Sequence, residues 1–195
     1  MGFQSVFAIK NDGTVLSFGR NSFGQLGLGD TIPRSIPTLI PNLTNVKSID
    51  AGVDHSLFLM NDGTVKTAGF NLYGQLGLGD IIDRKTPTIV SDLTNVKKVT
   101  AGYNHSLVLL NDGTVKVWGY NTDYQLGLGD SNNRLIPTNL PHLTNVSDIT
   151  TGYHFNIAML RDGTLKAWGH NSYGQLGFGG YGTSNKSIPT VLNIK

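Results

Sequence analysis

Short apolar runs alternate with turn-forming residues along the chain, and the alternation is plainest in the segment that begins at residue 51. Residues 55–60 (HSLFLM) are almost wholly apolar, which is typical of a strand covered on both faces. Residues 61–63 (NDG) follow as a tight turn, in which Asp-Gly is expected to supply the positive φ angles of a two-residue reversal. Residues 64–69 (TVKTAG) return as a second strand. The pattern therefore predicts a β-hairpin.

The next stretch predicts two more strands. Residues 71–80 (NLYGQLGLGD) hold too many glycines for a helix or a strand, so an ordered loop is expected. A third strand is expected over 87–90, with Pro87 first, where no backbone donor is needed. A turn at 92–95 then leads into a fourth strand at 96–100. Four short antiparallel strands without a helical pattern are typical of a β-propeller blade.

Glycine positions show that this unit recurs every 50 residues. Six glycine positions in four units make 24 places, and glycine fills 23 of them, Tyr124 being the exception. The sequence thus predicts one all-β repeat domain over 1–195, with repeats 1–50, 51–100, 101–150 and 151–195. The last repeat is short and lacks one strand.

The missing strand leaves the closure of the propeller open. Complete four-stranded blades can be drawn over 46–90, 96–140 and 146–191, whereas 5–40 supplies only three strands. Four blades could close alone, two chains could share one ring as a homodimer, or the chain could be part of a longer propeller. An unclosed array exposes strand edges, which favours association.

The string AG-x-x-HSL-x-L-x-x-DGTV-x-x-x-G-x-N-x-x-GQLGLGD, read over 51–80, resembles the repeat of the RCC1 (regulator of chromosome condensation) family of β-propellers. The third copy, at 101–130, repeats it closely. The resemblance implies an RCC1-like propeller whose loops at one end help to form partner-binding faces. It also implies two alternatives: a guanine-nucleotide exchange factor for a small GTPase, or a protein inhibitor of an enzyme.

Strand parity assigns the variable loops to one end of the blades. The nearly constant NDG turns lie at one end, so the AG-x-x and G-x-N loops emerge together at the other, here called the top face. Aromatic, amide and histidine residues gather in these loops, and such side chains anchor protein interfaces. They could also simply cover the blade ends. The candidate partner-binding residues are Phe3, Gln4, Arg20, Phe23, Val53, Asp54, Phe70, Tyr73, Tyr103, Asn104, Tyr120, Tyr153, His154, His170 and Tyr173.

Composition narrows the function classes. Only 14% of residues are charged and the net charge is +2, which argues against a nucleic-acid partner. No apolar run is long enough for a membrane span, and the N-terminus has no signal-peptide pattern. The absence of cysteine excludes disulfides and cysteine-ligated zinc but leaves the compartment unknown.

Four apparent motifs are interpreted as structural. The glycines at 177, 179 and 182 lack the βαβ context of a dinucleotide site. The histidines at 55 and 105 are expected to bond the backbone of a neighbouring blade, and the tryptophans at 118 and 168 to pack between blades. Arginines at 34, 84 and 134 each follow an aspartate by four residues, which predicts a local ion pair.

With no nucleophile or acid–base constellation, the sequence predicts no enzyme, no metal and no cofactor. The leading hypothesis is a non-enzymatic interaction module that binds a protein partner through its top-face loops.

Overall fold

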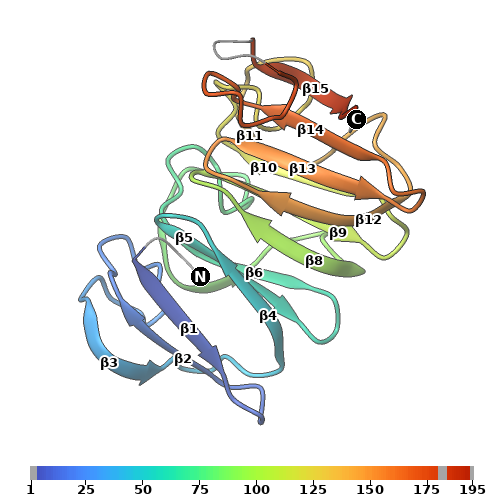
Figure 1. Cartoon of the computed structure of the whole chain (residues 1–195). Helices are drawn as coiled ribbons and strands as arrows, with labels where there is room; N and C mark the ends of the chain where they lie inside the picture. The colour runs from blue at the N-terminus through green and yellow to red at the C-terminus, as the bar shows by residue number, and fades with distance from the viewer. Residues whose placement is uncertain (1–3, 180–183, 194–195) are drawn as a thin grey trace.

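The computed structural model describes residues 4–179 and 184–193 and is built entirely of β-strands and loops (Figure 1). Within these residues no helix is long and apolar enough to cross a membrane. The strands are β1 (Ser5–Ile9), β2 (Val15–Gly19), β3 (Arg34–Leu39), β4 (Val46–Ala51), β5 (His55–Met60), β6 (Val65–Gly69), β7 (Arg84–Ile89), β8 (Val96–Ala101), β9 (His105–Leu110), β10 (Val115–Gly119), β11 (Arg134–Asn139), β12 (Val146–Thr151), β13 (Phe155–Leu160), β14 (Leu165–Gly169) and β15 (Lys186–Val191).

These strands form four antiparallel sheets in chain order, as the repeat predicted. The first sheet has the order β1-β2-β3, and the other three are β4-β5-β6-β7, β8-β9-β10-β11 and β12-β13-β14-β15. The predicted three-stranded unit at 5–40 is thus confirmed, and the strand it lacks is the innermost one. The first strand of each later sheet packs against the first strand of the next sheet, so β4, β8 and β12 form an inner row.

The four sheets form an open arc. In Figure 1 the first sheet and the fourth sheet lie at opposite ends of a curved stack, and β1 packs against β4. The described strands therefore do not close a four-bladed ring on their own. The arc leaves the outer face of the fourth sheet and the inner edge of β1 without a neighbouring sheet or strand from the described residues.

The hairpin turns differ from the two-residue reversal that the sequence predicted. Gly63 has a φ of 80°, whereas Asp62 keeps an ordinary negative φ. The N–H of Gly63 donates to the carbonyl of Met60 at 3.0 Å, and the N–H of Met60 donates to the carbonyl of Thr64 at 2.9 Å. This is a three-residue loop with glycine in the left-handed position. The Asp62 carboxylate instead accepts from the N–H and hydroxyl of Thr64.

The outermost strand of the second sheet, which was predicted as the third strand of the repeat, begins earlier than expected. Pro87 lies inside β7 and not at its first position, because β7 starts at Arg84. The strand is the outer edge of its sheet, where a residue without an N–H costs no ladder bond. The register also shifts between Thr67 and Gly69 of the neighbouring strand, so this part of the edge is irregular.

The core lies in the junctions between sheets. All six residues of β5 are buried, which confirms the prediction of a strand covered on both faces. Trp118 and Trp168 are fully buried, and each indole Nε1–H donates across a junction to the carbonyl of Gln75 or Gln125. The prediction that the tryptophans pack between blades is therefore confirmed.

A candidate binding face at the top of the sheets

Backbone hydrogen bonds place the two sets of variable loops at the same end of the sheets. The N–H of Phe70, after β6, donates to the carbonyl of Asp54, before β5, at 2.8 Å. The same bond recurs from Tyr120 to Asn104 and from His170 to His154, each at 2.9 Å. The top face deduced from strand parity is thus present in the structure.

Aromatic rings from successive sheets touch along this face. The Phe23 and Phe70 ring centroids are 4.7 Å apart, and those of Tyr73 and Tyr120 are 4.8 Å apart. Phe70 and Tyr73 meet edge to face at 6.0 Å, and the Arg20 guanidinium lies 5.7 Å from the centre of the Phe23 ring. The first three sheets are therefore linked by one row of rings.

The row continues onto the fourth sheet through two histidines. The ring centroid of His154 lies 6.1 Å from that of Tyr120 and 6.4 Å from that of His170. The ring centroids of His170 and Tyr173 are 6.2 Å apart. Tyr173 is 78% exposed. We call the whole row the aromatic stripe. Its members are Phe23, Phe70, Tyr73, Tyr120, His154, His170 and Tyr173, with Tyr103 and Tyr153 as a branch.

The branch lies near the inner strands. Tyr103 and Tyr153 stack at 4.2 Å, and Tyr103 also contacts His154 at 5.4 Å. With Val53 and three glycines of the AG-x-x loops, the two tyrosines line a hollow of about 200 Å³. Burial, followed by a hydrogen bond with Tyr103, raises the pKa of Tyr153. The phenol of Tyr153 therefore stays neutral at physiological pH.

Charged groups on the top face are paired. Asp54 lies 3.0 Å from Arg20 Nη1, and its carboxylate also accepts from Gln25 Nε2 at 3.0 Å. Burial raises the pKa of Asp54, although Arg20 opposes the rise. Burial likewise lowers the pKa of His154, against the attraction of Asp123, whose carboxylate is 3.8 Å away.

Sequence reasoning missed the glutamines that hold these loops together. Gln75 Nε2 donates to Asn104 Oδ1 at 3.3 Å, and Gln125 Nε2 lies 3.2 Å from His154 Nδ1. Each glutamine thus reaches from one sheet to the AG-x-x loop of the next sheet. The glutamine of the GQLG or YQLG string is the same in all four repeats, and this invariance was the available signal. The string was interpreted only as part of an ordered loop. Asn104 itself is only 9% exposed.

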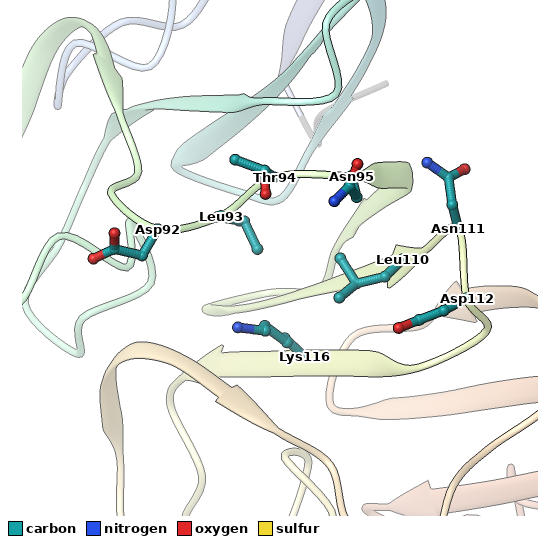
Figure 2. Close-up of a pocket in the computed structure, with 8 residues that line it drawn as sticks. All are labelled: Asp92, Leu93, Thr94, Asn95, Leu110, Asn111, Asp112 and Lys116. Carbon is teal, nitrogen blue, oxygen red and sulfur yellow. The ribbon is translucent and has the colours of Figure 1, made fainter.

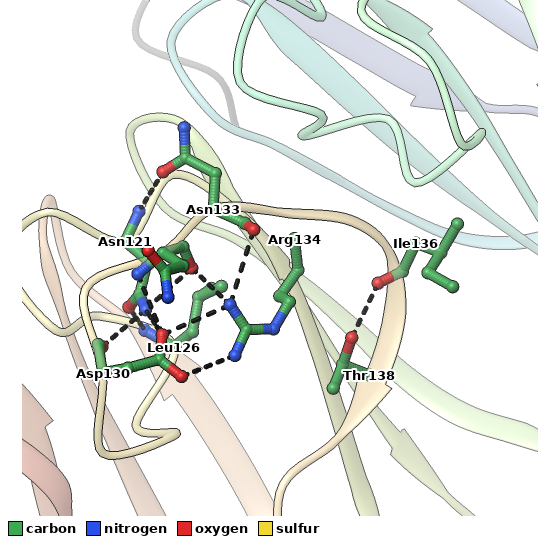
Figure 3. Close-up of polar contacts among 8 residues, drawn as sticks. Asn121, Leu126, Asp130, Asn133, Arg134, Ile136 and Thr138 are labelled. Atoms are coloured by element: carbon green, nitrogen blue, oxygen red, sulfur yellow. Dashed lines mark hydrogen bonds and ion pairs between the residues drawn. The ribbon is translucent and has the colours of Figure 1, made fainter.

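The long loops of the first three sheets are each fixed by a buried asparagine and an ion pair, as Figure 3 shows for the third sheet. Asn121 Nδ2 donates to the carbonyl of Asp130, and Asn121 Oδ1 accepts the N–H of Leu126 at 2.8 Å. Arg134 Nη2 lies 2.6 Å from the Asp130 carboxylate. Equivalent pairs join Arg34 to Asp30 and Arg84 to Asp80. The prediction of local ion pairs is confirmed, and these arginines do not form a free ring of cations.

The buried histidines bond across the sheet junctions, but not to backbone. His55 Nε2 lies 3.0 Å from Ser106 Oγ, and His105 Nε2 lies 2.8 Å from Asn156 Oδ1. The expected backbone partner was therefore wrong. Burial lowers the pKa of His55 to about 3 and that of His105 to about 4, so both imidazoles are neutral. Their side-chain hydrogen bonds therefore link neighbouring sheets.

The opposite end of the sheets carries hollows that follow the repeat. One of about 300 Å³ lies between the turn at Asp92–Asn95 and the hairpin at 110–112, with Lys116 across it (Figure 2). A second, of about 450 Å³, is lined mostly by residues 50 positions earlier, including Asn45 and Lys66. Because these hollows come from near-identical turns, they belong to the scaffold and distinguish no single site.

Most of the predicted residues therefore meet on one face. Gln4 is exposed at the start of the arc, and Phe3 lies outside the described residues, as does Gly182 of the glycine string. Among the described residues no group of three or more His, Cys, Asp or Glu side chains could hold a metal ion. The arrangement offers aromatic contact area and hydrogen-bonding tips on a fixed framework.

Comparison with known proteins agrees with this architecture. The model of the regulator of chromosome condensation (RCC1) repeat matches residues 12–59, 62–109 and 112–159, and a second model of that repeat matches 46–75, 96–125 and 146–175. The solved structure of human WBSCR16 superposes with a TM-score of 0.87 at 27% identity, covering 100% of this chain and 52% of that one. Yeast RCC1 (Prp20), solved bound to Kap60, superposes with a TM-score of 0.87 at 23% identity, covering 99% of this chain and 47% of that one.

The chain thus spans about half the length of these two structures, in keeping with its open arc. The three family matches together cover well over half of its residues. The chain belongs to the RCC1-repeat family, and its sheets are blades of an RCC1-type β-propeller.

Proposed function

We propose that this chain is a non-enzymatic interaction module that binds a protein partner through the aromatic stripe. One observation carries the proposal: ring contacts run without a break from Phe23 to Tyr173 across all four sheets. Scaffold packing alone does not require rings to meet at the exposed end of every sheet. Tyr153 and Tyr173 are 53% and 78% exposed, so part of the stripe is available to a partner.

The physical properties of the stripe suit a protein surface. Tyrosine and histidine combine apolar area with a polar tip, and tyrosine is enriched at interface centres. The loops beneath them are held by Asn121, Gln75 and Gln125, so little conformational freedom remains to be lost on binding.

Proteins of the same fold provide support for the partner class. Yeast RCC1 was solved bound to Kap60, and the structure of Prp20p was described together with its binding to Gsp1p and histones. Those partners belong to those proteins. The shared fold favours a protein partner for this chain and does not identify it.

The proposal is tested by removing exposed rings from the stripe. Tyr153→Ala and Tyr173→Ala should each reduce partner recovery in a pull-down several-fold, because both rings are exposed and contribute little to folding. Ile36→Ala and Ile136→Ala are matched controls, since these side chains on outer strands are 69% and 58% exposed. Equal recovery by all four variants would mean that the stripe is not the binding face.

Exchange activity is the second candidate function, favoured by the likeness to a protein described as binding Gsp1p. It would use the same face to bind a small GTPase. Accelerated release of labelled nucleotide from a panel of small GTPases would support it, and Tyr173→Ala should then slow that release. Inhibition of an enzyme by the stripe, the third alternative, would appear as loss of the target's activity at stoichiometric concentration.

The open arc also supports the proposal that two chains share one ring. At two of the three internal junctions a hydrogen-bonded polar pair meets: His55 with Ser106, and His105 with Asn156. The equivalent residues at the free ends of the arc are Phe155 in the fourth sheet and Val6 in the first. A head-to-tail contact between two chains would therefore replace the polar pair with an apolar one.

A further inference from the structure

The inner edge of the first sheet lacks the strand that every other sheet has. β5, β9 and β13 are each covered on this side by β4, β8 or β12. β1 occupies the position of β5 and has only β2 as a hydrogen-bonded neighbour among the described strands. It is therefore an edge strand at a place where the repeat elsewhere provides a partner.

The backbone of β1 presents alternate groups to this edge. Lys10 bonds towards the hairpin, since its N–H donates to Thr14 and its carbonyl accepts from Gly13. Because successive residues of a strand point their backbone groups to opposite edges, Phe7 and Ile9 face the open edge. The second sheet agrees, since the carbonyl of His55, the equivalent of Ser5, accepts the N–H of Gly52 on this side.

A hollow lies beside the same edge. Phe7 and Ile9 of β1, with Ile49 and Ala51 of β4, line a space of about 100 Å³. Ile9 is 41% exposed, whereas its equivalents in the second and third sheets, Leu59 and Leu109, are fully buried. The first sheet therefore leaves uncovered an apolar position that is buried in the second and third sheets.

We propose that the inner edge of β1 binds an extended polypeptide segment by antiparallel strand addition. The three inner strands of this chain show the chemistry of the occupant. They are Val46–Ala51, Val96–Ala101 and Val146–Thr151. Each has valine first, isoleucine or valine fourth, and alanine or threonine sixth.

The position of such a segment follows from the existing row. β4 packs beside β8, and β8 packs beside β12, so the inner row now ends at β4. An added strand would lie against β4 and pair with β1, covering the hollow. In the second sheet Ile49 pairs with Phe58, so the fourth residue of the segment would pair with Ala8. Main-chain bonds would supply affinity and the small sixth residue would supply specificity.

A peptide taken from this chain tests the proposal directly. A fluorescent peptide with the sequence of residues 94–102 (TNVKKVTAG) is titrated with the full 195-residue chain, and its anisotropy is followed. The control peptide is N-methylated at the positions of Lys98 and Thr100. These residues pair with Leu109 and Leu107, so their N–H groups would face β1. We expect saturable binding of the first peptide and at least tenfold weaker binding of the control.

A second variant keeps the test independent of folding defects. The segment TNVKKVTA is placed before Gly2, in place of Met1, because Ala101 directly precedes the equivalent Gly102. This addition should occupy the edge in cis, raise the thermal unfolding midpoint and abolish binding of the free peptide. Retained peptide binding in this variant, or equal binding of both peptides by the original chain, would overturn the proposal.

A second copy of the chain is the competing occupant. If β1 paired with β1 of another molecule, the chain would be a dimer that excludes the peptide, and Ile9→Lys would dissociate it. That outcome would also overturn the proposal.

Discussion

The Nε2 of His105 donates a hydrogen bond to Oδ1 of Asn156 at 2.8 Å, across the junction between the third and fourth sheets. The direction follows from the asparagine, because its Nδ2 already donates to the carbonyl of Gln125 at 2.7 Å. The proton of His105 is therefore on Nε2. Its Nδ1 is buried and has no hydrogen-bond partner. This junction depends on a neutral imidazole in one tautomer.

Removing the asparagine should destabilise the fold. Asn156→Ala leaves His105 Nε2 and the Gln125 carbonyl with one partner fewer in a buried junction, at a cost of about 1–3 kcal/mol. Asn139→Ala, on an exposed outer strand, should change the unfolding free energy by less than about 0.5 kcal/mol. Urea unfolding of both variants measures the difference. Equal values would mean that the junction bond contributes no net stability.

Acid should lower the free energy of unfolding over a pH range that the two buried histidines determine. Burial lowers the pKa of His55 to about 3 and that of His105 to about 4, whereas the unfolded chain titrates near 6.5. Below about pH 6.5 the unfolded state thus binds more protons than the native state. Stability is full above this pH and falls until about pH 4 for His105 and about pH 3 for His55, by up to about 1.4 kcal/mol per histidine for each pH unit.

The variant His55→Gln/His105→Gln tests this assignment. Its unfolding midpoint should depend less on pH between 6.5 and 4 than that of the parent chain, whatever its absolute stability. Asp30 and Asp130 have a lowered pKa because each bonds to an arginine, so their loss of stability begins only below about pH 4. An unchanged slope would assign the acid sensitivity to other groups.

One glycine position distinguishes backbone strain from contact across a junction. Gly77 has a φ of 72°, and a Cβ there would lie 2.8 Å from Trp118 Nε1. Gly177 has a nearly identical φ of 74°, but the nearest atom to its Cβ would be Leu192 Cδ2 at 3.4 Å. We expect Gly77→Ala to cost about 3 kcal/mol or more and Gly177→Ala about 1 kcal/mol. Thermal unfolding that gave equal costs would contradict a tight contact with the tryptophan.

The long loop should depend more on its asparagine than on its ion pair. Asn121 is fully buried and satisfies both donors and acceptors of the loop, so Asn121→Ala should cost about 1–3 kcal/mol. The pair of Arg134 with Asp130 is partly exposed, and Arg134→Ala should cost about 1 kcal/mol or less. Only the second effect should shrink in high salt, as denaturant unfolding at two salt concentrations would show.

Solution mass tests the proposed shared ring. If two chains pack head to tail, light scattering should give twice the mass of one chain at high concentration. Met159, on the outer face of the fourth sheet, is 43% exposed, and Met159→Lys should then shift the equilibrium towards single chains. A monomer at every concentration would contradict the shared ring. That result would not affect the proposal that the aromatic stripe binds a partner.

Much of the fold was predictable because the repeat is local. The positions of Gly13 and Gly63 and their equivalents predicted the hairpins, and the count of strands predicted the three-stranded first sheet. The wrong predictions concern the backbone geometry within a single turn or strand. Asp62 needs no positive φ once the loop has three residues, and Pro87 is tolerated inside β7 because that strand is an edge.

The site was predictable only in part. Sequence placed the aromatic residues on one face, but which rings touch depends on how closely successive sheets approach, and no local pattern gives that distance. The partner of His105 was missed for the same reason, since Asn156 lies 51 residues away. The linking role of Gln75 was hidden because an unvarying residue in a turn looks like part of the turn.

At every described junction, the backbone N–H of a glycine in the long loop of one sheet donates the same hydrogen bond to the next sheet. Gly29 bonds to the outer strand of the second sheet, Gly79 to that of the third, and Gly129 to that of the fourth. No contact in this series spans more than one junction. An additional 50-residue unit inserted between residues 100 and 101 would therefore contact, on both sides, the same kind of sheet surface that the existing units contact. Gene duplication could lengthen such a chain stepwise, each new unit being accommodated before the ring closes.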